Sequence, residues 1–176
     1  MSVLIWVLAI IAVYFFLIFL LTRLVVPFMS FKGFEKPERV PEEIKGKISE
    51  LENKSREPMS YLQAVYDLVL HKTLHQWKHS RFKAGIMFPR AFVKDLREIW
   101  QTNRFLYCTG INYLIYVMLI NSRFFKHDDI KVRHVFVNFF IHQYLQVKVG
   151  DKWVGVDPAG TGIRGKPLGE HLSFFG

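Results

Sequence analysis

The stretch that decides the fold runs from His142 to Pro158 and reads His-Gln-Tyr-Leu-Gln-Val-Lys-Val-Gly-Asp-Lys-Trp-Val-Gly-Val-Asp-Pro. Residues 143–149 alternate with a period of two, and residues 152–157 follow as a second run after Gly150 and Asp151. A two-residue loop with glycine first is typical of a type II′ turn. The stretch therefore predicts a β-hairpin whose last strand ends at the proline.

The turn also fixes the register of this hairpin. With residues 150–151 in the loop, Tyr144 stands opposite Asp157, and His142 lies two residues away on the same face. Diagonal neighbours on one face lie about 7–8 Å apart, and their side chains come closer at the tips. An aspartate beside an imidazole fixes the tautomer and stabilises the imidazolium. The hairpin thus predicts a His–Asp dyad, while Leu145 and the valines seal the other face.

Upstream of the hairpin the hydrophobic spacing is helical. Apolar side chains recur at helical spacing over 60–79, which opens with a capping-box pattern at Ser60, and again over 89–100. Residues 108–121 are apolar on nearly every side, which is typical of a helix in the middle of a domain. A further strand is expected over 131–139, where valine and phenylalanine are dense. The pattern predicts an α+β domain whose central helix packs against an antiparallel sheet.

Cys108 lies where this central helix begins, and it is the one cysteine of the chain. It excludes an intrachain disulfide framework and a metal site made of cysteines alone. The dipole and the free N–H groups of a helix N-terminus favour the thiolate, which is a competent nucleophile. A lone cysteine is more often a small buried hydrophobic residue. The dyad downstream favours the nucleophile.

Together these residues resemble the transglutaminase-like superfamily, in the papain-like fold. The resemblance covers roughly residues 60–158. It rests on the helix-opening cysteine, the strand that begins with histidine, the glycine turn followed by Lys-Trp, and the Val-Asp-Pro that closes the hairpin. It implies that Cys108 is the nucleophile, His142 the base and Asp157 the orienting carboxylate of a triad for acyl transfer at amides.

This resemblance implies a cysteine-dependent amide or peptide hydrolase, protease-like, that needs no cofactor and acts on a protein or peptide amide. Its oxyanion would be stabilised by the backbone N–H of Cys108 and by a side-chain donor, for which Gln101 and Trp100 are the candidates. A protein-crosslinking transglutaminase is one alternative. Members of the superfamily usually have glycine before the cysteine, where this chain has Tyr107. That departure motivates a second alternative, a catalytically inactive, membrane-tethered interaction module of the same fold.

The N-terminal residues carry a separate signal. No charged side chain occurs from residue 3 to 21, and a helix of that length is about 28 Å long, close to the thickness of a bilayer's hydrocarbon core. We expect residues 3–22 to cross the bilayer once. Basic residues follow this span and none precedes it, which favours a cytoplasmic domain and leaves an ectodomain open. A cleaved signal peptide is disfavoured, because no basic residue precedes Val3 and no small-residue cleavage pattern follows.

The expected organisation is a transmembrane anchor over 1–22, a charged, proline-punctuated stalk over 23–58 and a transglutaminase-like domain over 59–176. The formal net charge of +9 lies entirely after the anchor, so the domain is attracted to an anionic lipid surface. The chain has no nucleic-acid fold signature and no long Lys/Arg run, so nucleic acid is not an expected partner.

Three histidines, at 71, 75 and 79, have the spacing of ligands on one helix stripe. No Asp, Glu or Cys completes an obvious set with them. We therefore expect exposed histidines and no metal site.

Overall fold

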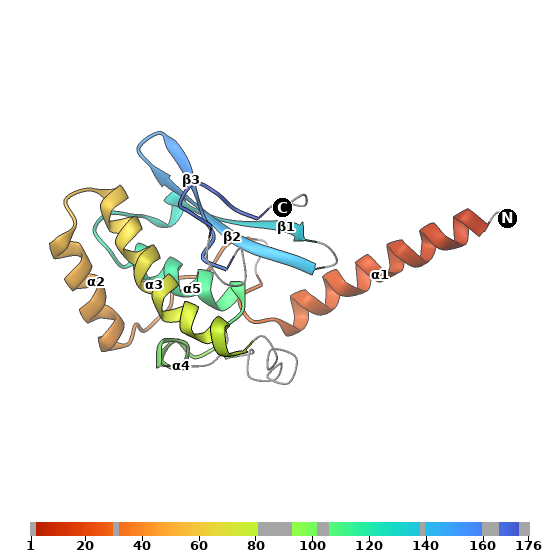
Figure 1. The fold of residues 1–176 in the computed structure, drawn as a ribbon, viewed down its shortest axis with the longest axis horizontal. Helices are drawn as coiled ribbons and strands as arrows, with labels where there is room; N and C mark the ends of the chain where they lie inside the picture. The colour runs from red at the N-terminus through yellow and green to blue at the C-terminus, as the bar shows by residue number, and fades with distance from the viewer. Residues whose placement is uncertain are drawn as a thin grey trace.

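The computed structural model describes residues 3–29, 32–80, 93–101, 106–137, 140–159 and 166–172. Figure 1 shows the order of the elements, which are α1 (Val3–Val25), α2 (Glu42–Lys54), α3 (Pro58–Ser80), α4 (Leu96–Gln101), α5 (Cys108–Ile120), the 3-10 helix η2 (His127–Asp129), β1 (Ile130–Val137), β2 (Phe140–Val149) and β3 (Lys152–Val156). The strands form one antiparallel sheet in the order β1-β2-β3. The α+β class is confirmed at this level.

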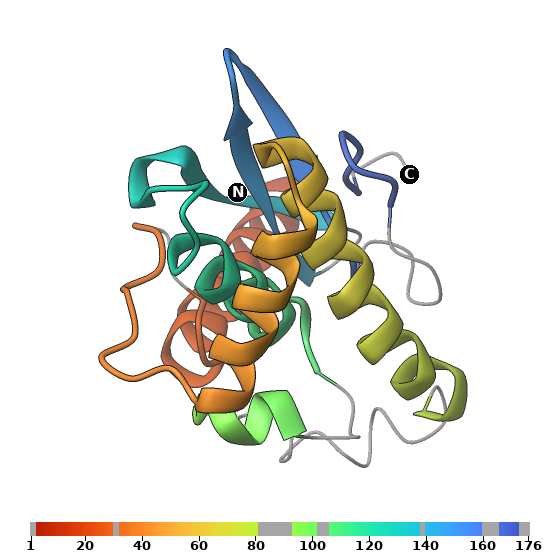
Figure 2. The same cartoon turned by 90° about the vertical axis from the view of Figure 1, so that its left-hand side faces the viewer.

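Helix α5 is the centre of the domain, as its all-round apolar sequence predicts. Its residues from Thr109 to Leu119 are buried. It packs against α3 on one side and β2 on the other, and Figure 2 shows α2 and α3 in front of it. The Tyr61 hydroxyl of α3 donates to the Met118 carbonyl at 2.9 Å, so a buried polar group adds to the apolar contact.

The β2–β3 hairpin has the predicted register. Leu145 pairs with Val156, and Val149 pairs with Lys152 across the turn. Gly150 has a φ of +60°, as the first position of a type II′ turn requires. Leu145 and Val156 are fully buried, and β2 lies against α5, so the apolar face of the hairpin seals the core.

The predicted helix over 60–79 is present as α3, but it begins two residues earlier. Pro58 occupies the first turn, where its missing N–H costs nothing. Ser60 therefore lies inside the helix, and its hydroxyl donates to the Glu57 carbonyl at 2.8 Å. The Gln63 amide donates to Asp67 at 3.0 Å. The predicted capping box is thus wrong.

Helix α4 is shorter than the predicted helix over 89–100. Its start is set by Asp95, whose carboxylate accepts from the Glu98 N–H at 2.9 Å and whose carbonyl accepts from the Ile99 N–H. An aspartate in this position ends the extended chain and begins the helix. The part of the prediction over 89–92 lies outside the described residues.

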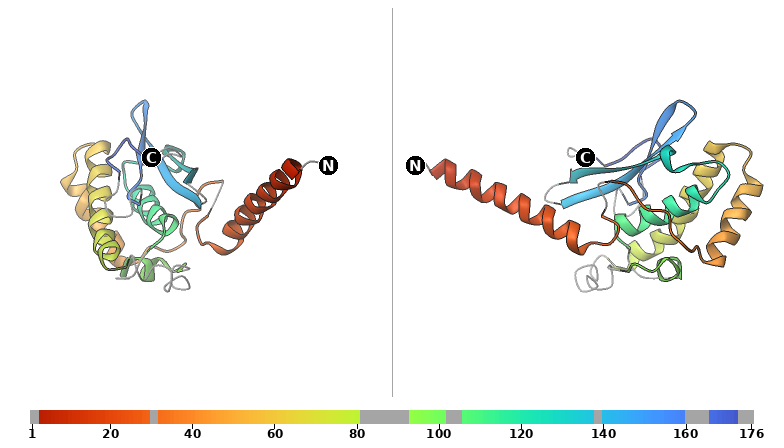
Figure 3. Two further views of the ribbon diagram at one scale, coloured as in Figure 1. Left: turned by 45° about the vertical axis from the view of Figure 1, so that its right-hand side comes forward. Right: turned by 180° about the vertical axis from the view of Figure 1, so that it is seen from behind.

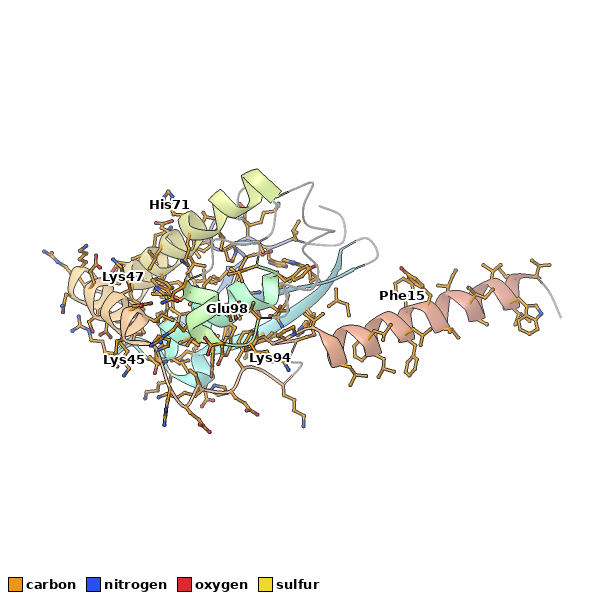
Figure 4. The ribbon with its side chains drawn as sticks, turned by 90° about the horizontal axis from the view of Figure 1, so that it is seen from below. Phe15, Lys45, Lys47, His71, Lys94 and Glu98 are labelled. Carbon is orange, nitrogen blue, oxygen red and sulfur yellow. The ribbon has the colours of Figure 1, made fainter. Side chains whose placement is uncertain are left out.

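Residues 23–58 do not form a separate stalk. Phe34 and, on α2, Ile44 and Ile48 are buried in the same core as α3 and α5. The outer face of α2 carries the ion pairs Lys45–Glu42 and Lys54–Glu50, and Figure 4 shows Lys45 and Lys47 on its outside. The apolar face of α2 is narrow, but it is sufficient to dock the helix on the core.

Helix α1 projects from the domain (Figure 3). Its segment Val3–Leu21 is long and apolar enough to cross a membrane, with a mean hydropathy of 3.1 and no burial inside the domain. That finding rests on length and composition, which a signal sequence near an N-terminus shares. The helix continues to Val25, three residues beyond the predicted span.

We expect Ile44→Ala to destabilise the domain by about 2–5 kcal/mol, because it removes a fully buried side chain and leaves a cavity. The exposed neighbour Lys45 provides the control, since Lys45→Ala is expected to change stability by less than about 0.5 kcal/mol. Thermal unfolding of both variants in detergent measures the difference. Equal losses of stability in the two variants would contradict the docking of α2 on the core.

Candidate active site

The structure brings His142 and Asp157 together as the hairpin register predicts. His142 lies on β2, and Asp157 directly follows β3. The Nε2–H of His142 donates to the carboxylate, with distances of 3.0 Å to Oδ1 and 2.9 Å to Oδ2. Asp157 is fully buried and His142 is 9% exposed. Asp157 thus fixes the orientation of the imidazole ring. Nδ1 is the second ring nitrogen that can donate or accept a hydrogen bond.

Cys108 is the third residue of the candidate site, and helix α5 carries it. It is the first residue of α5, it is partly exposed, and its thiol is close enough to His142 to influence the pKa of the imidazole. Burial lowers the pKa of His142, but the hydrogen bonds and charges of Asp157 and Cys108 outweigh burial and raise it to about 10. The raised pKa keeps His142 protonated at neutral pH.

The first turn of α5 also offers hydrogen-bond donors. The N-cap residue Tyr107 makes no side-chain cap, and the first helical bond runs from the Ile111 N–H to the Tyr107 carbonyl at 3.1 Å. The N–H groups of residues 108–110 therefore have no acceptor within the helix. Such groups bind anions and stabilise a developing oxyanion.

The segment 166–172 holds Asp157 from outside the sheet. The Leu172 N–H donates to Asp157 Oδ2 at 3.0 Å, and the Lys166 N–H donates to the Asp157 carbonyl at 2.9 Å. The Tyr66 hydroxyl of α3 donates to the Lys166 carbonyl. Burial, followed by the charge of Asp157, raises the pKa of Tyr66 to about 12, so this donor keeps its proton.

Gly155 lets the segment 166–172 come this close. The Gly169 N–H donates to the Gly155 carbonyl at 2.8 Å, and a Cβ on Gly155 would lie 3.2 Å from the Glu170 carbonyl oxygen. The ring of His171 stacks on Tyr144 with centroids 4.2 Å apart. The segment therefore covers the face of the hairpin on which Asp157 lies.

Asn112 and Gln143 join α5 to β2 beside the candidate site. Asn112 lies one turn after Cys108, and its Nδ2 donates to the Gln143 carbonyl at 2.6 Å. Both side chains are fully buried, and Asn112 Oδ1 and Gln143 Oε1 are without a hydrogen-bond partner among the described residues. This bond fixes the helix that carries the thiol against the strand that carries the base.

His134 lies opposite Gln143 on β1. Burial, and then the charge of His142, lowers the pKa of His134 to about 4. A neutral His134 accepts a hydrogen bond, and its Nε2 lies 3.2 Å from Gln143 Nε2. The sheet thus holds one histidine charged and a neighbouring one neutral, because Asp157 favours the charged form of His142 while burial favours the neutral form of His134.

The two oxyanion donors predicted from the sequence make contacts with other residues. Gln101 is exposed, and its Nε2 donates to Glu43 of α2 at 3.1 Å. Trp100 lies under Lys72, whose Nζ is 4.8 Å from the ring centroid. Gln101 thus contacts α2, while α4 as a whole packs against α5.

Two residues of the site escaped the sequence analysis, and each had a signal. Asn112 is a carboxamide inside an otherwise apolar central helix, one turn from the cysteine. Gln143 is a polar residue on the apolar face of β2, between the positions of Ile141 and Leu145. A polar side chain on a buried face needs a hydrogen-bond partner, so both positions indicated a buried hydrogen bond.

A scan against protein-family models and searches of curated proteins and of solved structures found no match for this chain. The geometry of the described residues therefore carries the functional assignment.

Stability should fall with rising pH through the titration of His142. Its pKa is raised from 6.5 to about 10, so its stabilisation is fully present below pH 6.5 and is lost as the pH rises toward 10. The difference in free energy of unfolding between the wild type and His142→Gln should shrink over that window by at least about 1 kcal/mol. Denaturant titrations at both ends measure it. A difference that grows with pH would contradict the raised pKa, and the exposed His71→Gln is the control.

Asn112→Leu should lower the reactivity of Cys108 while leaving the free energy of unfolding of the domain nearly unchanged. It removes the unpartnered Oδ1 along with one hydrogen bond, so the free energy of unfolding should change by less than about 1 kcal/mol. The alkylation rate of Cys108 should nevertheless fall, because the first turn of α5 loses its tie to β2. Asn121→Leu, which removes a bond to the Val117 carbonyl at the other end of α5, is the matched control. Equal rates in the two variants would remove Asn112 from the site.

Proposed function

We propose that this chain is a membrane-anchored, cysteine-dependent amide or peptide hydrolase of the transglutaminase-like type, in the papain-like fold. The observation that supports it best is the position of His142 between a buried carboxylate and a thiol at a helix N-terminus. A helix-opening cysteine packed on an antiparallel sheet, with histidine on β2 and aspartate after β3, supports the type. No cofactor is part of the proposal.

In the first half of the reaction the Cys108 thiolate attacks the carbonyl carbon of the amide. A C–S bond forms, and the carbonyl π pair moves to oxygen, where the backbone N–H of Cys108 stabilises it. The protonated His142 then gives its proton to the amide nitrogen, the C–N bond breaks, and the amine leaves. Asp157 holds the ring in place throughout and stabilises its charged form.

In the second half, water attacks the thioester. Neutral His142 takes a proton from the water while the new C–O bond forms, and the C–S bond then breaks to release the acid and restore the thiolate–imidazolium pair. An amine in place of water would complete a crosslinking transglutaminase reaction instead. Hydrolysis is favoured because it needs no second protein site.

The proposal includes α1 as the anchor. Residues 3–22 would cross the bilayer once, and the basic residues that follow the span favour the cytoplasmic side for the domain. The substrate would be a protein or peptide amide on that side, and the net charge of +9 would draw the domain to anionic lipid.

Alkylation by iodoacetamide tests the proposed pair of Cys108 and His142 directly, because Cys108 is the one cysteine of the chain. At neutral pH the wild type should be alkylated, and His142→Ala should lower the rate about tenfold or more, since the imidazolium no longer stabilises the thiolate. Asp157→Asn should lower it as well, and His71→Ala should not. Mass spectrometry measures the product, with Cys108→Ala as the blank.

A thiol that reacts only after unfolding, with the same rate in the wild type and in His142→Ala, would contradict the hydrolase. It would favour the inactive, membrane-tethered interaction module, whose thiol is a packing residue.

A further inference from the structure

Phe28, just beyond the end of α1, is held in an unusual backbone conformation. Its φ is +60°, in the left-handed region that residues other than glycine seldom adopt. Its ring stacks on Tyr113 of α5 with centroids 4.0 Å apart and planes 11° apart. Its carbonyl accepts from Gln143 Nε2 of β2 at 3.1 Å. A strained conformation persists where surrounding contacts over-determine it, so this turn is docked rather than loose.

The two residues that hold Phe28 belong to the elements of the candidate site. Tyr113 follows Asn112, which ties α5 to β2, and Gln143 follows His142. Pro27 and Met29 on either side of Phe28 are buried. The segment 26–29 is therefore attached directly to the helix and the strand that carry Cys108 and His142.

This attachment sets the height of the site above a bilayer that α1 crosses. Helix α1 is about 35 Å long, enough to bring its end at Val25 into the headgroup layer. Phe28 is three residues further, which is at most about 11 Å of chain. The proposed catalytic pair is therefore held close to the membrane surface. A long flexible linker, in contrast, would let the domain sample soluble substrates freely.

The face of the domain beside the end of α1 also suits a headgroup layer. An open cavity of about 880 Å³ lies there, lined by Leu24 and the segment 26–29 together with Lys32, Lys36 and Lys94, against the single acidic residue Glu35. Figure 4 shows Lys94 at the end of the domain nearest α1. Lysines beside a membrane span attract anionic headgroups.

We infer that the site works at the membrane surface, on an amide bond in a peptide segment that is itself attached to the bilayer, such as the juxtamembrane stretch of a second membrane protein. This inference rests on the proposed function. An extended segment rises about 3.3 Å per residue, so its amides a few residues beyond the headgroups are at the height of Cys108. Confinement of both partners to one surface raises their effective concentration.

The test uses the full chain in nanodiscs, whose two faces are both accessible. Iodoacetamide is attached to a phosphatidylethanolamine headgroup through a short spacer, of about 10 Å, or a long one, of about 40 Å, and soluble iodoacetamide is used in parallel. In the wild type we expect the short and long reagents to alkylate Cys108 at rates within about twofold of each other, because the thiol lies near the surface.

A rigid helical insertion of about 22 Å between Val25 and Val26 is the matched variant. It leaves the Phe28 contacts intact and lifts the whole domain. We expect the ratio of short-reagent to long-reagent rates to fall about tenfold, while the rate with soluble iodoacetamide stays that of the wild type. Cys108→Ala is the blank.

The outcomes separate the two proposals. If soluble iodoacetamide and the long reagent label the wild type but the short reagent does not, the site lies far from the bilayer, and the inference fails alone. The same holds if the insertion leaves the ratio unchanged. If soluble iodoacetamide fails to label the folded wild type, the proposed hydrolase fails and takes the membrane-surface substrate with it.

Discussion

The buried carboxylate of Asp157 is the constraint on which the rest of the domain depends. A charge with no exposure to water must be compensated by partners, and each partner here comes from a different part of the chain. His142 supplies a charged hydrogen bond from β2, and the Leu172 N–H supplies another from the segment 166–172. The hairpin register brings His142 to this carboxylate, and the close approach at Gly155 brings the segment 166–172 to it. Disturbing either one would remove a partner from a buried charge.

Polar ties also organise the helical side. Tyr61 and Tyr116 each bury a ring and donate a hydroxyl to a backbone carbonyl, that of Met118 and of Phe34 respectively. Burial raises the pKa of both hydroxyls, so they remain donors. These bonds connect α3 and the chain before α2 to the C-terminal half of α5. The central helix is thus held by directional contacts as well as by apolar packing, which gives a helix with no polar face a fixed rotation and a fixed position along its axis. The placement of Cys108 at the site depends on that position.

The sequence predicted those features that local rules determine. A two-residue turn and strict alternation leave one register for the hairpin, and the register alone placed His142 beside Asp157. The all-apolar helix could lie only in the core. The features that failed depend on where elements pack in three dimensions. The isoleucines of α2 form a face too narrow to show from the sequence that the helix docks on the core, and Gln101 bonds to Glu43, which lies 58 residues away in the sequence. Asn112 and Gln143 contribute through the hydrogen bond between them, and a single sequence does not show which residues are in contact.

The segment 166–172 also protects an edge of the sheet. In the order β1-β2-β3, β3 is an edge strand, and an edge strand offers unpaired backbone groups to any other extended chain. The N–H groups of Gly169 and Lys166 bond to carbonyls of Gly155 and Asp157 at that edge. The chain thus covers its own exposed edge over the residues nearest the site. This cover would keep neighbouring copies of the chain from joining their sheets into aggregates.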